Sequence, residues 1–84
     1  MNAKNRKTLL ALYEQPTPCD IGWTDVEALF LSCGAEIREG RGSRVRVALR
    51  GKVAVFHRPH PSPRCGRATV RDVREFLRNA GVKP

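Results

Sequence analysis

Apolar positions recur at helical spacing in three stretches of the chain. The first lies within residues 1–15, where a basic leader precedes Leu9, Leu10 and Tyr13. In the second, the apolar positions repeat at i, i+3, i+4 and i+7, and they are Val26, Leu29, Phe30 and Cys33. In the third, they are Val70, Val73, Phe76, Leu77 and Ala80. These spacings predict three helices, each with one face toward a core.

The ends of the last two helices carry start and stop signals. Thr24 and Thr69 each precede an apolar stripe and have an acidic residue three positions later, which predicts that both threonines are N-caps. Gly34 and Gly81 are placed to end the same helices. Residues 15–21 contain two prolines and predict a linker, because proline cannot continue a helix.

Between the second and third helices the apolar period changes to two. Residues 44–50 place Arg or Ala at one position and Val or Leu at the next, a strict alternation that is the pattern of a half-buried strand. Gly51 predicts a tight turn, after which 53–57 return antiparallel. Residues 35–39 predict a further short strand at the edge of the sheet.

The register of this hairpin decides which side chains share a face. With a two-residue turn that includes Gly51, each even-numbered residue of the first strand opposes an odd-numbered residue of the second. His57 is then expected on the outer face with Arg44 and Arg46, whereas Phe56 is expected toward the core. A three-residue loop would reverse this placement.

The predicted order is therefore α, α, β, β, β, α, an α+β fold with helices on one face of a three-stranded antiparallel sheet. Residues 58–63 contain three prolines and end the sheet, and 64–67 predict a loop. We expect residues 1–21 to form an N-terminal helix and linker, and residues 22–84 to form the domain proper. A chain of 84 residues has room for one small core.

The composition narrows the class of partner. The chain has 16 Lys and Arg against 8 Asp and Glu, a formal net charge of +8, and most of these cations are Arg. Guanidinium groups match phosphate geometry, so this excess favours a phosphate-rich partner. A basic surface without a ligand, or one that binds an acidic protein, would have the same composition.

Other features exclude several classes of protein. No apolar run is long enough to span a membrane, and the short apolar part of the N-terminus does not predict a secretory signal. The three cysteines are widely spaced and lack CxxC spacing, which predicts neither a metal site nor a disulfide framework. Free thiols in a reducing cytosol fit this pattern best, so we expect a cytoplasmic protein without a cofactor.

The two histidines are the candidates for chemistry. His57 and His60 lie near several arginines, and the chain has neither a phosphate-binding glycine loop nor a nucleophile elbow. Imidazole titrates near neutral pH and can move protons in phosphodiester cleavage. RNA supplies its own 2′-hydroxyl nucleophile, so a base or acid with cationic support needs no metal. Alternatively, His57 hydrogen-bonds a loop and His60 orients the proline-rich turn.

Three motifs in this order resemble the HicA toxin family. They are the Gly42-Ser43 turn, the Pro59-His60-Pro61 end of the third strand, and the T-x-R helix from Thr69 to Gly81. The resemblance covers about residues 24–82. It implies a ribosome-independent mRNA interferase, an endoribonuclease with a double-stranded-RNA-binding-like fold (αβββα), which is encoded with a HicB-like antitoxin. The leader before Trp23 lies outside it.

One departure bears on catalysis. The resemblance implies a catalytic histidine shortly after the Gly-Ser turn, but Arg44 fills that place. We therefore expect His57 to be the leading acid or base and His60 the second, with Arg44 as part of the catalytic set. The expected RNA-binding residues are Arg41, Arg44, Arg46, Arg50, Lys52 and Arg58. The antitoxin would cover this basic face, and a non-catalytic RNA-binding module or a basic adaptor for an acidic protein is the alternative.

Overall fold

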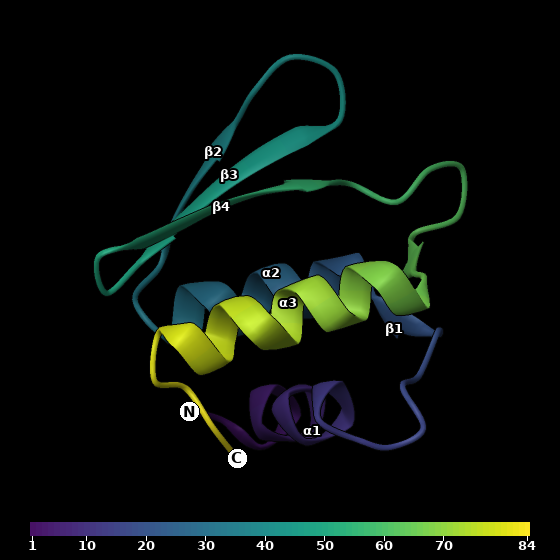
Figure 1. Ribbon diagram of the computed structural model, residues 1–84, viewed down its shortest axis with the longest axis vertical. Helices are drawn as coiled ribbons and strands as arrows, with labels where there is room; N and C mark the ends of the chain where they lie inside the picture. Colours follow the sequence, from purple (N-terminus) through teal and green to yellow (C-terminus); the bar gives the residue numbers. More distant parts are fainter.

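The computed structural model covers residues 1–84 and has three layers (Figure 1). The helices are α1 (Ala3–Leu12), α2 (Trp23–Ser32) and α3 (Arg67–Asn79). The strands are β1 (Ile21–Gly22), β2 (Glu36–Glu39), β3 (Arg44–Leu49), β4 (Lys52–His57) and β5 (Arg64–Cys65). The sheet β2-β3-β4 is covered on one face by α2 and α3, and α1 lies beneath these two helices. The predicted αβββα fold with an additional N-terminal helix is confirmed.

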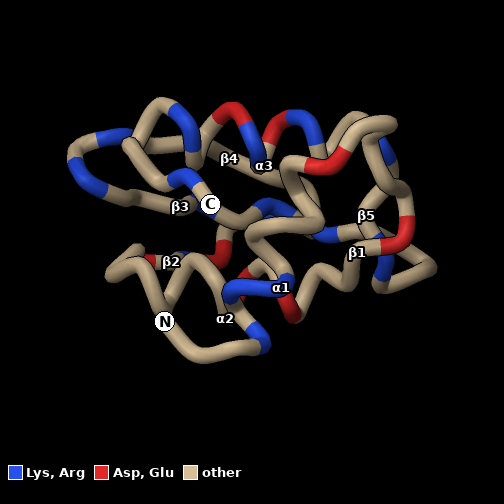
Figure 2. Tube along the Cα trace, turned by 90° about the horizontal axis from the view of Figure 1, so that it is seen from below, with Lys and Arg blue, Asp and Glu red and all other residues tan.

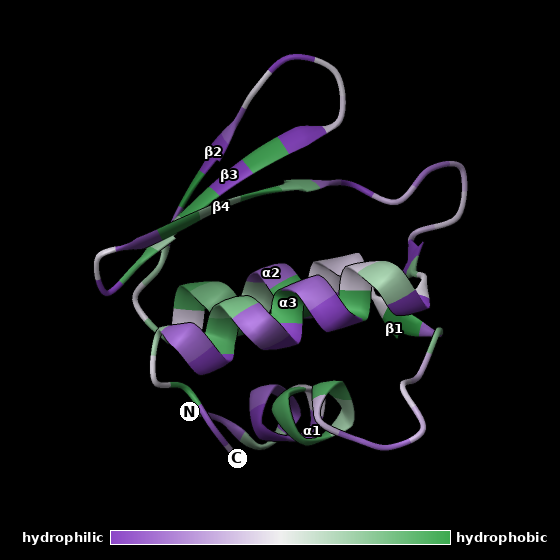
Figure 3. Ribbon diagram, viewed as in Figure 1, coloured by the Kyte–Doolittle hydropathy of each residue, from purple (hydrophilic) through white to green (hydrophobic).

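The β3–β4 hairpin has the predicted two-residue turn. Leu49 pairs with Lys52, and Arg50 and Gly51 between them have φ values of 49° and 80°. Positive φ at both turn positions matches the right-handed twist of the strands. In this register Arg44 opposes His57, and hydrophilic and hydrophobic residues alternate along the first part of β3 (Figure 3). The predicted faces are thus confirmed for Arg44, Arg46, His57 and Phe56, whereas Arg50, which was expected to continue the outer face, lies in the turn.

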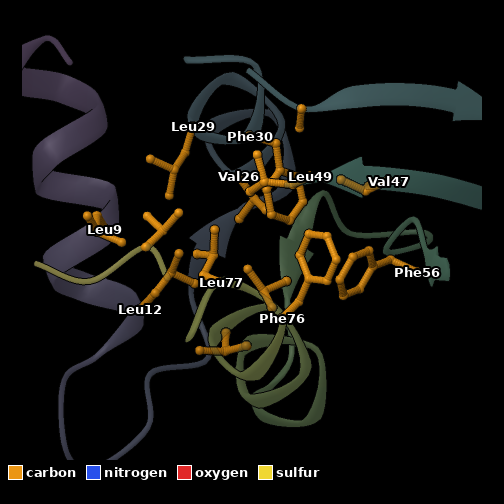
Figure 4. Close-up of a cluster of buried hydrophobic side chains, with 14 of the residues drawn as sticks. Leu9, Leu12, Val26, Leu29, Phe30, Val47, Leu49, Phe56, Phe76 and Leu77 are labelled. Atoms are coloured by element: carbon orange, nitrogen blue, oxygen red, sulfur yellow. The ribbon is translucent and has the colours of Figure 1, made fainter. Parts of the chain in front are cut away.

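An aromatic cluster joins the sheet to the helices (Figure 4). The ring centroid of Phe56 lies 5.7 Å from that of Phe30 on α2, 5.8 Å from that of Phe76 on α3 and 6.0 Å from that of Trp23. Phe30 and Phe76 also meet edge to face at 5.7 Å. Such arrangements add to the free energy gained by burial alone. Phe56 therefore connects the sheet to both α2 and α3.

A second, two-stranded sheet sets the start of α2 and α3. β1 pairs antiparallel with β5, and the Trp23 amide donates to the Pro63 carbonyl at 2.8 Å. The N-caps are Gly22 and Gly66, neither of which has a side chain to cap the helix. The predicted caps at Thr24 and Thr69 and the predicted loop at 64–67 are wrong, because this pairing begins both helices earlier.

The N-terminal helix is part of the same core. Leu9 and Leu12 of α1 are buried against α2 and α3, and the Tyr13 hydroxyl donates to the Val82 carbonyl at 2.8 Å. Leu10, which was expected in the apolar cluster, is exposed, and Leu12 takes its place. None of the three helices is long and apolar enough to cross a membrane.

Replacing Phe56 tests the contact between the sheet and the helices. We expect Phe56→Ala to lower the free energy of unfolding by about 3–5 kcal/mol, because a large buried side chain is removed. Val55→Ala, at the adjacent and exposed position of β4, should change it by less than about 0.5 kcal/mol. Urea unfolding measures both. If Phe56→Ala does not fold, Phe56→Leu should still unfold at lower urea than Val55→Ala, and equal midpoints would contradict this role.

The buried thiol of Cys65 should make the free energy of unfolding decrease at alkaline pH. Burial raises the pKa of the Cys65 thiol from 9.0 to about 11. The unfolded state loses this proton first, so the free energy of unfolding should fall as the pH rises from about 9 to about 11, by about 2 kcal/mol from this group. Urea unfolding of Cys65→Ala over the same pH range should show a shallower fall. Parallel pH profiles would contradict the prediction.

Candidate nucleic-acid interface

The sheet face away from the helices is open and basic. It carries Arg44, Arg46 and Ala48 from β3, Val53, Val55 and His57 from β4, and Glu36 and Arg38 from β2. All of these side chains except the half-buried Ala48 are exposed. We call this set the outer face. It is positioned by the inward packing of the alternate residues, of which Val45, Val47 and Phe56 are buried.

Arg44 and His57 are direct neighbours across the hairpin. They are cross-strand partners at the end of β3 and β4, and the Arg58 amide donates to the Ser43 carbonyl at 2.8 Å beside them. This bond makes Ser43 and Arg58 the hydrogen-bonded pair, so Arg44 and His57 form a non-hydrogen-bonded pair, in which the side chains are closest. An imidazole and a guanidinium thus lie side by side on an exposed surface.

Like charges also meet on the outer face. Arg38 of β2 is the cross-strand partner of Arg46, an arrangement that destabilises a sheet unless an anion offsets it. The Arg38 Nε donates to Glu36 Oε1 at 2.5 Å, whereas Arg44 and Arg46 make no ion pair. Arg38 was not among the expected site residues, because the pairing register of β2 cannot be read from five residues of sequence.

The rest of the outer face is apolar. Val53 and Val55 of β4 are 52% and 57% exposed, although valine is usually buried. Arg41 lies in the exposed turn between β2 and β3, where Gly42 has a φ of 63°, and it makes no ion pair. The surface therefore combines guanidinium groups with short apolar side chains.

Three residues expected at the interface do not lie on the outer face. Arg50 is in the turn, and its Nη1 donates to the Ala80 carbonyl near the end of α3 at 3.2 Å. Lys52 opposes the buried Leu49 and lines a hollow between β4 and α3. Lys52 follows the inward half of the strand alternation, whereas Arg50 leaves the alternation because it lies in the turn after β3.

Arg58 also points toward the helices. Its guanidinium pairs with Glu39 of β2 and, at 3.6 Å, with Glu27 of α2. The hydrogen bond to Glu39 raises the pKa of Arg58 above its ordinary value. Two carboxylates thus offset the charge of Arg58, which was expected to bind RNA.

His60 lies apart from the strands. It is exposed in the loop between β4 and β5, three residues beyond His57, and it makes no hydrogen bond through its side chain. No group of three or more His, Cys, Asp or Glu side chains is arranged to hold a metal ion. Of the expected catalytic residues, the fold brings together Arg44 and His57.

Comparison with known families places this arrangement in context. The family model described as the HicA toxin of bacterial toxin–antitoxin matches residues 23–82, most of the chain. The chain belongs to the HicA toxin family. No curated protein and no solved structure matches the chain. This match confirms the predicted family. HicA proteins are the toxins of toxin–antitoxin systems, and each has a cognate antitoxin as its partner.

The matched region does not include the N-terminal helix. The HicA region begins at Trp23, the first residue of α2, and it contains the whole β2-β3-β4 sheet and α3. α1 and the segment that follows it precede the matched region, although α1 packs on α2 and α3. The outer face lies within the HicA region, and Arg44 follows its Gly42-Ser43 turn directly.

Proposed function

We propose that this HicA protein binds mRNA on the outer face and cleaves it as an endoribonuclease without a metal cofactor. The observation that carries the proposal is the cross-strand pair of Arg44 and His57. It puts an imidazole, the side chain used most often in general acid–base catalysis, beside a guanidinium that makes no ion pair. Arg38, Arg46 and Arg41 extend the basic surface along the sheet and its turn.

The chemistry needs few groups. His57 takes the proton of a ribose 2′-hydroxyl, whose oxygen attacks the adjacent phosphorus while the bond to the 5′-oxygen breaks. The departing 5′-oxygen takes up a proton from water, so the products carry a 2′,3′-cyclic phosphate and a 5′-hydroxyl. Arg44 stabilises the negative charge that develops on the phosphorus oxygens. In this proposal Arg44, at the position where the family resemblance implies a histidine, keeps an electrostatic role, and His57 supplies the proton transfer.

The same surface suits the cognate antitoxin. A HicB-like partner that covers Arg44, Arg46 and His57 with carboxylates would offset the like charges of the sheet and block RNA together. Both roles place the protein in the cytoplasm with its mRNA target. The exposed Val53 and Val55 add apolar area to either contact.

RNA binding without cleavage is the second candidate. The observation that favours it is that the outer face carries a single imidazole, and the guanidinium of Arg44 beside it has no acceptor atom and cannot serve as a base. A module of this fold reads phosphates and 2′-hydroxyl groups and needs no imidazole.

Removing His57 tests the cleavage. We expect His57→Ala to lower the rate of RNA cleavage by about 10²–10⁴, because proton transfer is lost. The measurement is cleavage of a labelled RNA in EDTA by protein freed of antitoxin, with detection of 2′,3′-cyclic phosphate ends. Binding of a 2′-O-methyl RNA, which has no nucleophile, should change little.

His60→Ala is the matched control for this test. It removes an imidazole three residues away and should leave the rate within about tenfold of wild type. Full activity of His57→Ala would overturn the catalytic assignment. Wild-type protein that binds RNA but leaves it intact would establish the second candidate instead.

Salt dependence tests the binding surface. We expect Arg44→Gln and Arg46→Gln each to weaken binding of 2′-O-methyl RNA about fivefold at 0.1 M salt and to reduce the salt slope by about 0.7, as loss of one phosphate contact to a single strand predicts. Arg58→Gln removes the same charge where carboxylates already offset it and should change both values less. Equal losses in all three variants would indicate an effect of net charge alone.

A further inference from the structure

A polar hollow lies on the helical side of the molecule, away from the sheet. It has a volume of about 510 Å³ and no hydrophobic lining residue. Its walls are Gln15, Pro16 and Thr17 from the segment after α1, and Arg67, Arg71 and Arg74 from α3. The spacing of these arginines, i, i+4 and i+7, places them on one helix face. Three guanidinium groups therefore converge on one concave surface.

Arg74 is the most unusual of the three. Its side chain is buried, with 7% of the residue exposed, although arginine is almost never buried unless it is paired with an acid. Its Nη2 donates to the Thr17 hydroxyl at 2.8 Å, and no carboxylate contacts it. A guanidinium has five N–H donors, and those of Arg74 that have no acceptor within the protein remain open to solvent.

The other arginines of the hollow are equally free of acids. Arg67 Nε donates to the Thr17 carbonyl at 3.3 Å, and Arg71 makes no ion pair or side-chain hydrogen bond. Acidic positions do alternate with basic ones along α3 (Figure 2), but Asp72 and Glu75 line the different hollow beside β4. The charge of the arginine hollow is thus not neutralised from within the chain.

The start of α3 adds to the positive potential. Arg67 is the first residue of the helix, its N-cap is Gly66, and the first turn contains no acidic residue. The backbone N–H groups of this turn have no side-chain acceptor, and the helix dipole favours an anion near them. This feature supports the hollow but would not define a site without the buried Arg74.

We infer that this hollow is a phosphate-binding site, formed by Arg67, Arg71 and Arg74 against the segment 15–17. A phosphate oxyanion offers the acceptors that the guanidinium donors lack, and it offsets the charge of three cations. Because residues 15–17 precede the matched HicA region, the site depends on the additional N-terminal segment of this chain. It goes beyond the proposed cleavage site and does not require cleavage.

Titration with inorganic phosphate tests the site. At ionic strength held constant with chloride, we expect saturable NMR shifts at residues 15–17 and 66–71 and at the Arg side-chain N–H groups. Arg71→Gln should weaken phosphate binding about tenfold, because a charge-assisted hydrogen bond is lost. Its side chain is exposed and unpaired, so the variant should fold normally. Arg67→Gln provides a second variant with the same expected direction.

Arg6→Gln is the matched control, because Arg6 is exposed on α1 and lines another hollow near the chain termini. It makes the same change in net charge and should leave the phosphate affinity unchanged. Equal weakening in Arg6→Gln and Arg71→Gln, or wild-type shifts that do not saturate, would overturn the inference.

The source of the phosphate is tested with a 2′-O-methyl oligonucleotide. If the site binds RNA backbone, the oligonucleotide displaces phosphate from residues 66–71, and Arg71→Gln reduces its salt slope by about 0.7. If the site binds free phosphate or a small phosphorylated molecule, the oligonucleotide leaves these signals unchanged while phosphate still shifts them. Either result supports the site, and both are independent of whether His57→Ala abolishes cleavage.

Discussion

The burial of Phe56 between Phe30 and Phe76 determines which residues this protein presents on its sheet. In a strand, adjacent side chains point to opposite faces, so an inward Phe56 requires an outward His57. The two-residue turn at Arg50 and Gly51 fixes the register between β4 and β3. It therefore places Arg44 opposite His57 on the same face. A slip of one residue would place His57 among aromatic rings and expose Phe56. The same packing that stabilises the fold therefore creates the outer face.

The fold was largely predictable, because most of its determinants are local. Alternation over 44–50 and the glycine after it predict the hairpin, and Gly34 and Gly81 end their helices with φ values of 90° and 80°. The β1–β5 pairing was not predictable. Each of these strands has two residues, and about 40 residues separate them, so neither has a periodicity to recognise. This pairing sets the starts of α2 and α3. The N-caps are therefore Gly22 and Gly66, although Thr24 and Thr69 have the better side chains for capping.

The candidate site was predictable only in part. The alternation of side chains along the two strands was enough to predict that Arg44, Arg46 and His57 share a face, because this placement depends only on the register of the hairpin. It was not enough for Arg58, because Glu27 and Glu39, which offset its charge, come from two other elements. Arg74 is buried against Thr17, a contact that its position along α3 does not predict. The roles of Arg58 and Arg74 thus depend on partners that are distant from them in the sequence.

The distribution of acids separates the arginines by function. Arg58 and Arg78 contact carboxylates, and Arg50 binds the carbonyl beyond α3, so these cations contribute to the fold. Of the arginines without an acid, Arg44 and Arg46 lie together on the outer face, and Arg67, Arg71 and Arg74 lie together in the hollow at α3. Concentrating like charge destabilises a small domain. A ligand that brings negative charge to either place offsets that repulsion, so each cluster favours an anionic partner. The outer face is extended and suits a polymer of phosphates. The hollow, with one guanidinium fixed by burial, suits a single phosphate group.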